Sequence, residues 1–127
     1  MNYIDFCLPS DELTNEDLQK IFPDFTAEKI NDKVGISVRC ISNENIYALD
    51  LGIHAAKNLF DKNNIDPTNI DFLIFCTQSP DRTLPSGSAI IQDKLNLKTT
   101  TGAIDINQGC SGYIYSLFVA FSILKTN

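Results

Sequence analysis

The chain has 127 residues, 43% of them hydrophobic and 20% charged, and carries a formal net charge of −6. This apolar content is enough to build a core, which excludes an intrinsically disordered tail, and the composition also excludes a collagen-like or disulfide-dense miniprotein. The acidic balance and the absence of any run of Lys or Arg argue against nucleic acid and a membrane surface as partners.

Four cysteines, Cys7, Cys40, Cys76 and Cys110, are spread along the chain without a C-x-x-C pair. This spacing does not favour a metal site. The N-terminus lacks the basic and long apolar regions of a secretory signal, so we expect a cytoplasmic protein with free thiols. Cys7, Cys40 and Cys76 lie in strand-like apolar runs, and we expect them in the core.

The first 41 residues predict short elements. In chain order these are a strand over residues 3–8, a helix capped by Thr14 that ends near Ile21, a helix from Thr26 to Ile30, and a strand over residues 36–41. The first helix start rests on Thr14 followed three residues later by Asp17, the spacing of a capping box. The last strand rests on the alternation of apolar and polar residues after Gly35.

The remainder alternates helices and strands. We expect a helix from Ser42 or Asn43 to about Asn63, a strand over residues 72–76, a helix over 89–95, a strand over 99–106 and a helix over 113–125. Residues 72–76 are apolar throughout, which is typical of a strand covered on both faces. Alternating strands and helices predict right-handed crossovers, and therefore an α/β fold with a largely parallel sheet.

The segment from Asp105 to Tyr113 carries the clearest chemical signal. A strand ends, a turn of small residues holds Cys110 close to two glycines, and an apolar helix begins. Glycines permit a sharp bend and the close approach of a substrate. The unpaired N–H groups of a helix start favour a thiolate and can stabilise an oxyanion. The pattern is analogous to a nucleophile elbow with Cys in place of Ser, and a buried Cys in a glycine-rich turn is the alternative.

Several stretches then match a known family in order along the whole chain. They are Leu8-Pro9, Thr14–Leu18, Gly35-Ile36 with Arg39, Asp50-Leu51 with Ala55-Ala56, Ile70-Asp71, Thr77–Asp81, Leu84–Ser86, Asp105-Ile106 and Cys110–Tyr113. The chain thereby resembles the N-terminal part of the β-ketoacyl-acyl-carrier-protein synthase III family, condensing enzymes of the thiolase fold. The resemblance implies a thiolase-like layered α/β fold with a mixed, largely parallel sheet. Residues 1–127 would form one incomplete domain, the N-terminal half only.

The resemblance implies an activity for Cys110. In that family the matching cysteine takes an acyl group from a thioester, and the acyl-enzyme condenses with malonyl-acyl-carrier protein in fatty-acid-type synthesis. It also implies a cytoplasmic homodimer that uses acyl-CoA or acyl-carrier protein as substrate, with no cofactor and no metal. The His and Asn that assist in the family match positions beyond residue 127. His54, the only histidine, does not match the family base, and we expect it to pack or to face solvent.

Four positions bear on the acyl donor. Val34 replaces a common Thr, and Lys29 stands where coenzyme-A-using members commonly have a Trp that stacks on adenine. Lys33 matches a basic position of the family, and Lys33 and Arg39 are candidates to contact a phosphate of the coenzyme A or carrier ligand. A lysine binds phosphate as a point charge but cannot stack as an indole does, which favours a carrier-bound or unusual donor. An ordinary surface or salt-bridge role is the alternative for Arg39.

Leu84 matches a position in the dimer loop of the family, where one residue, often aromatic, reaches the partner's acyl pocket. A smaller aliphatic side chain would widen that pocket and admit a longer or branched acyl group. Simple packing of the loop is the alternative.

The last expected helix bears on completeness. Residues 113–124 contain ten apolar residues of twelve. Such a helix must be buried on all sides, and it is too short to span a bilayer. We therefore expect the central helix of a larger layered body, and a chain that is inactive alone. Two alternatives remain open: a specialised condensing or acyl-transfer enzyme of a secondary-metabolite or glycan pathway, and a non-catalytic thiolase-like dimerisation module.

Overall fold

The structure, a computed structural model, describes residues 2–126. The chain divides into two compact units. The first comprises the residues up to Cys7 together with those from Tyr47 onward, and the second comprises Leu8–Ile46. Within residues 2–126, no helix has the length and apolar character needed to cross a membrane.

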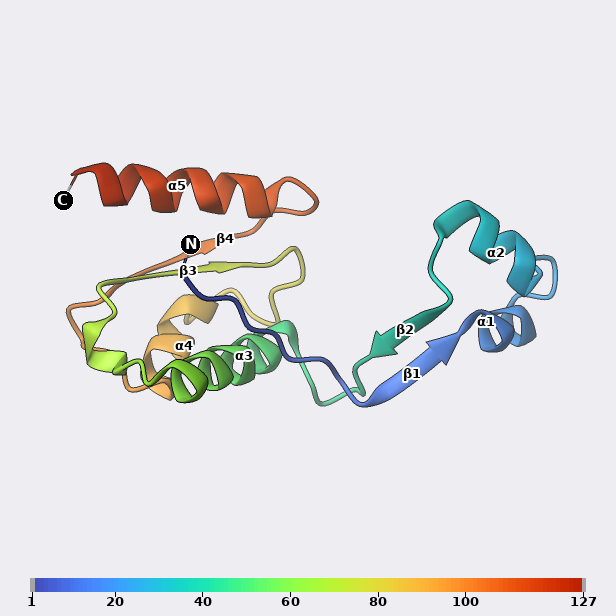
Figure 1. Cartoon of the computed structure of the whole chain (residues 1–127), viewed down its shortest axis with the longest axis horizontal. Coiled ribbons are helices and arrows are strands. Elements are labelled where there is room, and N and C mark those ends of the chain that lie inside the picture. The colour runs from blue at the N-terminus through green and yellow to red at the C-terminus, as the bar shows by residue number, and fades with distance from the viewer. Residues whose placement is uncertain (1, 127) are drawn as a thin grey trace. The chain divides into compact units, whose positions relative to one another are not determined.

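The first unit is a layered α/β body. Its elements are α3 (Ala48–Asn63), the 3-10 helix η1 (Pro67–Asn69), β3 (Phe72–Cys76), α4 (Gly87–Lys94), β4 (Gly102–Ile106) and α5 (Gly112–Thr126). β3 and β4 pair in parallel, and α4 makes the crossover between them. α3 and α4 lie on one side of the strand pair and α5 lies on the other (Figure 1). The predicted α/β architecture, with β3 covered on both faces, is confirmed.

The core of this unit lies between the two helices α3 and α4 and strand β3. The buried residues are Leu49, Ile53, Ile91, Leu95 and Leu97, and Phe75 of β3 packs against them. Burying such a side chain fully stabilises the fold by about 1.5–3 kcal/mol relative to leaving it exposed. This cluster therefore holds the helical layer against the sheet.

Helix α5 packs against β3 on one side only within the described part of the chain. Its exposed large apolar side chains are Tyr113, Ile114, Tyr115, Leu117, Phe118, Phe121 and Leu124. Within the described residues this helix is therefore not buried on all sides, and it leaves an apolar patch exposed.

The second unit is a two-stranded ribbon with two short helices. β1 (Asp11–Thr14) pairs antiparallel with β2 (Val38–Ile41), and the helices are α1 (Asn15–Ile21) and α2 (Ala27–Val34). Both predicted caps are confirmed: the hydroxyl oxygen of Thr14 accepts from the Asp17 N–H at 3.1 Å, and that of Thr26 accepts from the Lys29 N–H at 3.2 Å. These bonds satisfy N–H groups that a helix start otherwise leaves unpaired.

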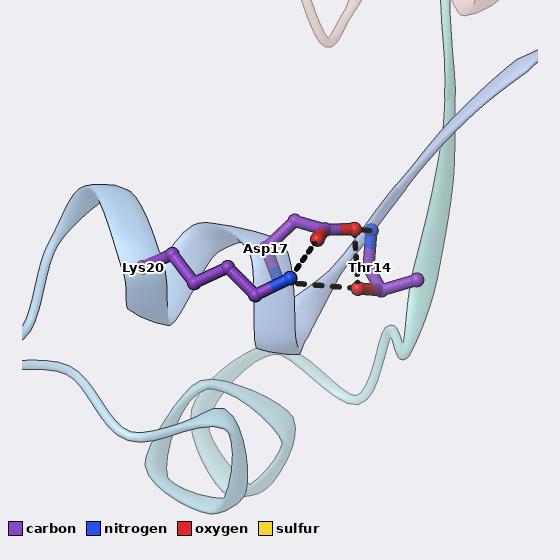
Figure 2. A network of polar contacts seen from close by, with 3 residues as sticks. All are labelled: Thr14, Asp17 and Lys20. Carbon is purple, nitrogen blue, oxygen red and sulfur yellow. Dashed lines mark hydrogen bonds and ion pairs between the residues drawn. The ribbon is translucent and has the colours of Figure 1, made fainter.

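The cap of α1 is a network of three side chains (Figure 2). The Asp17 carboxylate accepts hydrogen bonds from the Thr14 N–H at 3.3 Å and from its hydroxyl at 2.6 Å. The Lys20 ammonium donates to the same carboxylate at 2.8 Å. Lys20 first, and Thr14 after it, lower the pKa of Asp17 from 3.8 to about 2. The Asp17 carboxylate therefore joins Thr14 and Lys20 in the cap.

Three sequence expectations are wrong. Residues 3–8 form no strand, and the strand that starts the ribbon is Asp11–Thr14 instead. The long helix begins at Ala48 rather than at Ser42 or Asn43, because the Asn43 side chain accepts from the Asn45 N–H at 3.0 Å and forms a turn. Cys40 is exposed rather than in the core, and Cys7 and Cys76 are half-buried. Cys40 lies in β2, whose only strand partner in the described residues is β1.

Candidate active site

Cys110 lies exposed in the turn between β4 and α5. The Gln108 N–H donates to the Ile106 carbonyl at 3.1 Å, and the Gly112 N–H donates to the Gly109 carbonyl at 2.8 Å. These bonds define what we call the Cys110 turn, residues 107–111. The Cys110 sulfur stands two residues before Gly112, the first residue of α5.

Gly109 and Gly112 are needed in this turn because neighbouring side chains approach them closely. A Cβ on Gly112 would lie 2.6 Å from the Sγ of Cys76 and 3.0 Å from the Cβ of Gln108, and a Cβ on Gly109 would lie 2.8 Å from the Oε1 of Gln78. Real Cβ contacts are longer, so a side chain at either position would force a neighbour to move: the Cys76 thiol or the turn itself at Gly112, and the flexible end of the Gln78 side chain at Gly109. The glycines thus pack the Cys110 turn against the end of β3 and the residues that follow it.

The loop of residues 77–86 runs from β3 to α4 and begins beside the Cys110 turn. The Thr77 N–H donates to the Ile106 carbonyl at 3.2 Å. Leu84 is 83% exposed and precedes a cis peptide bond to Pro85. The loop and the turn follow the carboxyl ends of adjacent parallel strands, the edge at which open α/β sheets bind ligands. The structure therefore brings the segments of Cys110 and Leu84 to one edge.

Asp105 joins β4 to the start of α4, a contact that the sequence did not reveal. Its carboxylate accepts from the Gly87 N–H at 2.8 Å and from the Ser88 N–H at 2.7 Å. One signal was available in the sequence: Asp105 is a charged residue in a strand otherwise made of Gly, Ala and Ile, and such a residue needs polar partners. Gln78, whose side chain lies against Gly109, carried no such signal.

Lys33 and Arg39 belong to the second unit, whereas Cys110 and Leu84 belong to the first. Lys33 is exposed in the last turn of α2 and lines a hollow of about 440 Å³ together with Phe25 and Lys29. Lys33 is thus accessible to a ligand. His54 is exposed on α3, in agreement with the expectation that it faces solvent.

The Arg39 guanidinium is engaged within its own unit. Its Nη1 donates to the Oδ1 of Asn15 at 2.7 Å, and its Nη2 donates to the carbonyl of Ile36 at 3.4 Å. Asn15 is buried and itself donates to the Ile36 carbonyl at 3.0 Å. These bonds favour a structural role for Arg39. No group of three or more His, Cys, Asp or Glu in residues 2–126 is placed to hold a metal ion.

No family model matches the chain. Comparison with individual proteins does find relatives. The β-ketoacyl-acyl-carrier-protein synthase III of Clostridium acetobutylicum is 40% identical over 120 residues, which are 94% of this chain and 36% of that protein. A crystal structure of a 3-oxoacyl-(acyl-carrier-protein) synthase III has a TM-score of 0.92 at 41% identity, covering 98% of this chain and 37% of its own. The Aquifex aeolicus enzyme has a TM-score of 0.88 at 35% identity, covering 96% and 39%.

The chain contains a layered α/β body with a cysteine between the end of β4 and α5, and these crystal structures match it closely. The chain therefore has the thiolase-like fold. Within that fold class, the chain is similar to the N-terminal part of β-ketoacyl-acyl-carrier-protein synthase III proteins. It spans about a third of the length of the curated relatives that it matches.

Proposed function

We propose that the chain is the N-terminal part of a β-ketoacyl-acyl-carrier-protein synthase III, an acyltransferase of fatty acid biosynthesis in which Cys110 is the catalytic nucleophile. The observation that carries this proposal is an exposed cysteine in the turn that leads into α5. It occurs in a chain that is 40% identical to a synthase of that kind. The glycines packed around the cysteine support the same reading, because they keep the turn tight and the sulfur open to a substrate.

The reaction has two half-reactions. The Cys110 thiolate attacks the carbonyl carbon of an acyl thioester, a new C–S bond forms, and the carrier leaves as a thiol after it takes up a proton. A malonyl thioester then loses CO₂, and the resulting carbanion attacks the acyl carbon and expels the Cys110 thiolate. The product is a β-ketoacyl thioester, and Cys110 is regenerated. N–H groups at a helix start are suited to stabilise the oxyanion of each tetrahedral intermediate.

The acyl donor is proposed to be acyl-CoA or acyl-carrier protein, with no further cofactor. Lys33 supports contact with a phosphate of that donor, because it is exposed beside the aromatic ring of Phe25 and the second cation Lys29. Arg39 is the weaker candidate, since Asn15 and the Ile36 carbonyl already occupy two of its nitrogens. Replacing Lys33 with Ala tests this contact through the KM for the donor.

The intact enzyme is proposed to be a cytoplasmic homodimer in which Leu84 reaches the acyl pocket of the partner. The exposure of this large apolar side chain supports the dimer, because an exposed leucine at a loop tip gains free energy when a partner covers it. Equilibrium sedimentation of the intact protein measures its oligomeric state.

The test uses the intact protein, with any sequence that follows residue 127, and a radiolabelled acyl thioester. Peptide mapping is expected to find the label on Cys110 and to find none after Cys110→Ser. Cys40→Ser is the matched control, because Cys40 is also exposed but lies in the other unit. Label on Cys40, or on no thiol, contradicts the proposal.

A second measurement separates condensation from simple acyl transfer. Adding malonyl-acyl-carrier protein to the acylated enzyme is expected to release CO₂ and a β-ketoacyl product. Acyl transfer without CO₂ would instead indicate a specialised transferase. Reading the gene past codon 127 is expected to supply a His and an Asn, and a frame without them would indicate a non-catalytic module.

A further inference from the structure

Asp105 faces the helical layer formed by α3 and α4. It pairs in register with Phe75 of β3, so the two side chains project from the same face of the parallel pair. The Phe75 ring lies against Gly87 of α4, where a Cβ would come within 2.7 Å of it. A carboxylate in this position is stable only when it is hydrogen-bonded. Its partners are the N–H groups of Gly87 and Ser88.

The role of Asp105 differs from that of the residue that caps α4. Ser86 is the N-cap, and its hydroxyl oxygen accepts from the Ala89 N–H at 3.4 Å. Asp105 instead holds the two N–H groups that come directly after the loop of residues 77–86. The contact thus joins segments 17 and 18 residues apart in the sequence. It attaches the C-terminal end of the loop to β4, the strand that leads into the Cys110 turn.

The near end of the same loop is also attached to the Cys110 turn region. Thr77 donates to the carbonyl of Ile106, and the Gln78 side chain lies against Gly109. Both ends of the loop are therefore attached to β4 or to the Cys110 turn. The attachment made by Asp105 is the one whose hydrogen-bond acceptor is a carboxylate. Hydrogen bonds to a charged acceptor are about twice as strong as neutral ones.

We propose that Asp105 is a positioning residue that holds the loop of residues 77–86 and the Cys110 turn in one fixed arrangement. This inference rests on the proposed function of Cys110. Asp105 touches no reacting atom and acts through α4 and the loop. Loss of the carboxylate frees the start of α4 and, with it, the wall that the loop provides beside the nucleophile.

The direct test is Asp105→Asn in the intact protein. Asparagine keeps the size of the side chain, but its NH₂ group faces one of the two N–H donors and cannot accept. Because a displacement of about 1 Å can cost about 100-fold in rate, we expect acylation of Cys110 to slow about ten-fold or more in kcat. We expect the KM for the acyl thioester to change little, since Lys33, the candidate contact for the phosphate of the donor, lies in the other unit.

Two controls separate positioning from loss of the fold. Asp93→Asn makes the same charge change on the exposed surface of α4 and is expected to leave acylation unchanged. The intact protein with Asp105→Asn is expected to keep a cooperative melting transition, and the alkylation rate of Cys40, which is exposed in the other unit, serves as the reference rate in the same sample. If that variant does not fold, Asp105→Glu retains both acceptor oxygens and is expected to reduce kcat by a smaller factor.

The outcomes are distinct. Wild-type kcat in Asp105→Asn overturns the inference, and so does a fall in kcat accompanied by loss of the cooperative melting transition. If wild-type Cys110 is never acylated, the proposed function fails, and the ratio of Cys110 to Cys40 alkylation rates still tests positioning. A ratio that is equal in wild type and Asp105→Asn then overturns the inference, and a changed ratio supports it.

Discussion

The contact between Gly112 and Cys76 permits a quantitative test of how the Cys110 turn is held. Gly112 is the buried first residue of α5, and a methyl group there would lie 2.6 Å from the Sγ of Cys76. Gly112→Ala therefore forces either the thiol to rotate or the start of α5 to move away from β3. The second response displaces Cys110, because only one residue separates it from Gly112.

Two effects of opposite sign determine the stability of Gly112→Ala. Overpacking a well-packed site costs about 1–3 kcal/mol, whereas replacing Gly by Ala in a helix gains up to about 1 kcal/mol. We expect the free energy of unfolding to fall by about 1 kcal/mol. Cys76→Ala removes the sulfur, so the double variant keeps the helix gain without the collision with the sulfur, and only the approach to the Cβ of Gln108 remains. The coupling energy between the two substitutions is expected to be favourable by about 1–3 kcal/mol.

Urea unfolding of the wild type, both single variants and the double variant of the intact protein gives the four free energies of the cycle. The rate of Cys110 alkylation, measured in parallel, should change in Gly112→Ala and return toward the wild-type value in the double variant. A coupling energy near zero would show that the sulfur is not what excludes a side chain at position 112. Our account of the packed turn would then be incorrect.

Three further predictions concern the loop, the cap of α1 and the core. Leu84→Phe should shift the acyl preference of the intact enzyme toward shorter chains, and an acyl-chain-length series that does not change would contradict the pocket role. The pKa of Asp17 lies at about 2, below its ordinary value of 3.8, so its stabilisation of the cap is complete above about pH 4 and is lost as the pH falls through 2. A carbon NMR titration of the Asp17 carboxyl group should give this midpoint. Lys20→Met should raise the midpoint, because Lys20 is the largest cause of the shift. A midpoint near 3.8 in the wild type would refute the cap geometry. Ile53→Ala should lower the free energy of unfolding by about 2–5 kcal/mol in urea melts, since Ile53 is buried in the core between α3, α4 and β3; a loss below 1 kcal/mol would show that this cluster does not hold the layer.

Features set by local sequence were predictable. The continuous apolar run of β3 predicted a strand between two layers with the bounds that the structure has, because helices lie on both faces of it. The cap at Thr14 was equally readable, since its partner Asp17 lies three residues away. The turn with Cys110 followed from small residues between a strand and a helix, all of them neighbours in the chain.

Features set by distant partners were not predictable. Residues 3–8 have the composition of a strand, yet a strand forms only where a second strand accepts its hydrogen bonds, and residues 3–8 have none in the described part of the chain. The polar residues of β1 form a strand because β2 pairs with them. The expectation that Cys40 lies in the core was wrong for a related reason. Alternating apolar residues indicate which face of a strand is apolar, but they do not show whether another layer covers that face.

Asp105 lies between these two cases and shows what a sequence can still indicate. A carboxylate in an apolar strand must have polar partners, so its presence alone predicts a buried contact of unknown destination. The partners, the N–H groups of Gly87 and Ser88, carry no side-chain signature, because every residue except proline offers such a donor. The proposed nucleophile was therefore visible in the sequence, whereas the residue that we propose to position it became visible only when the strand and the helix start were placed side by side.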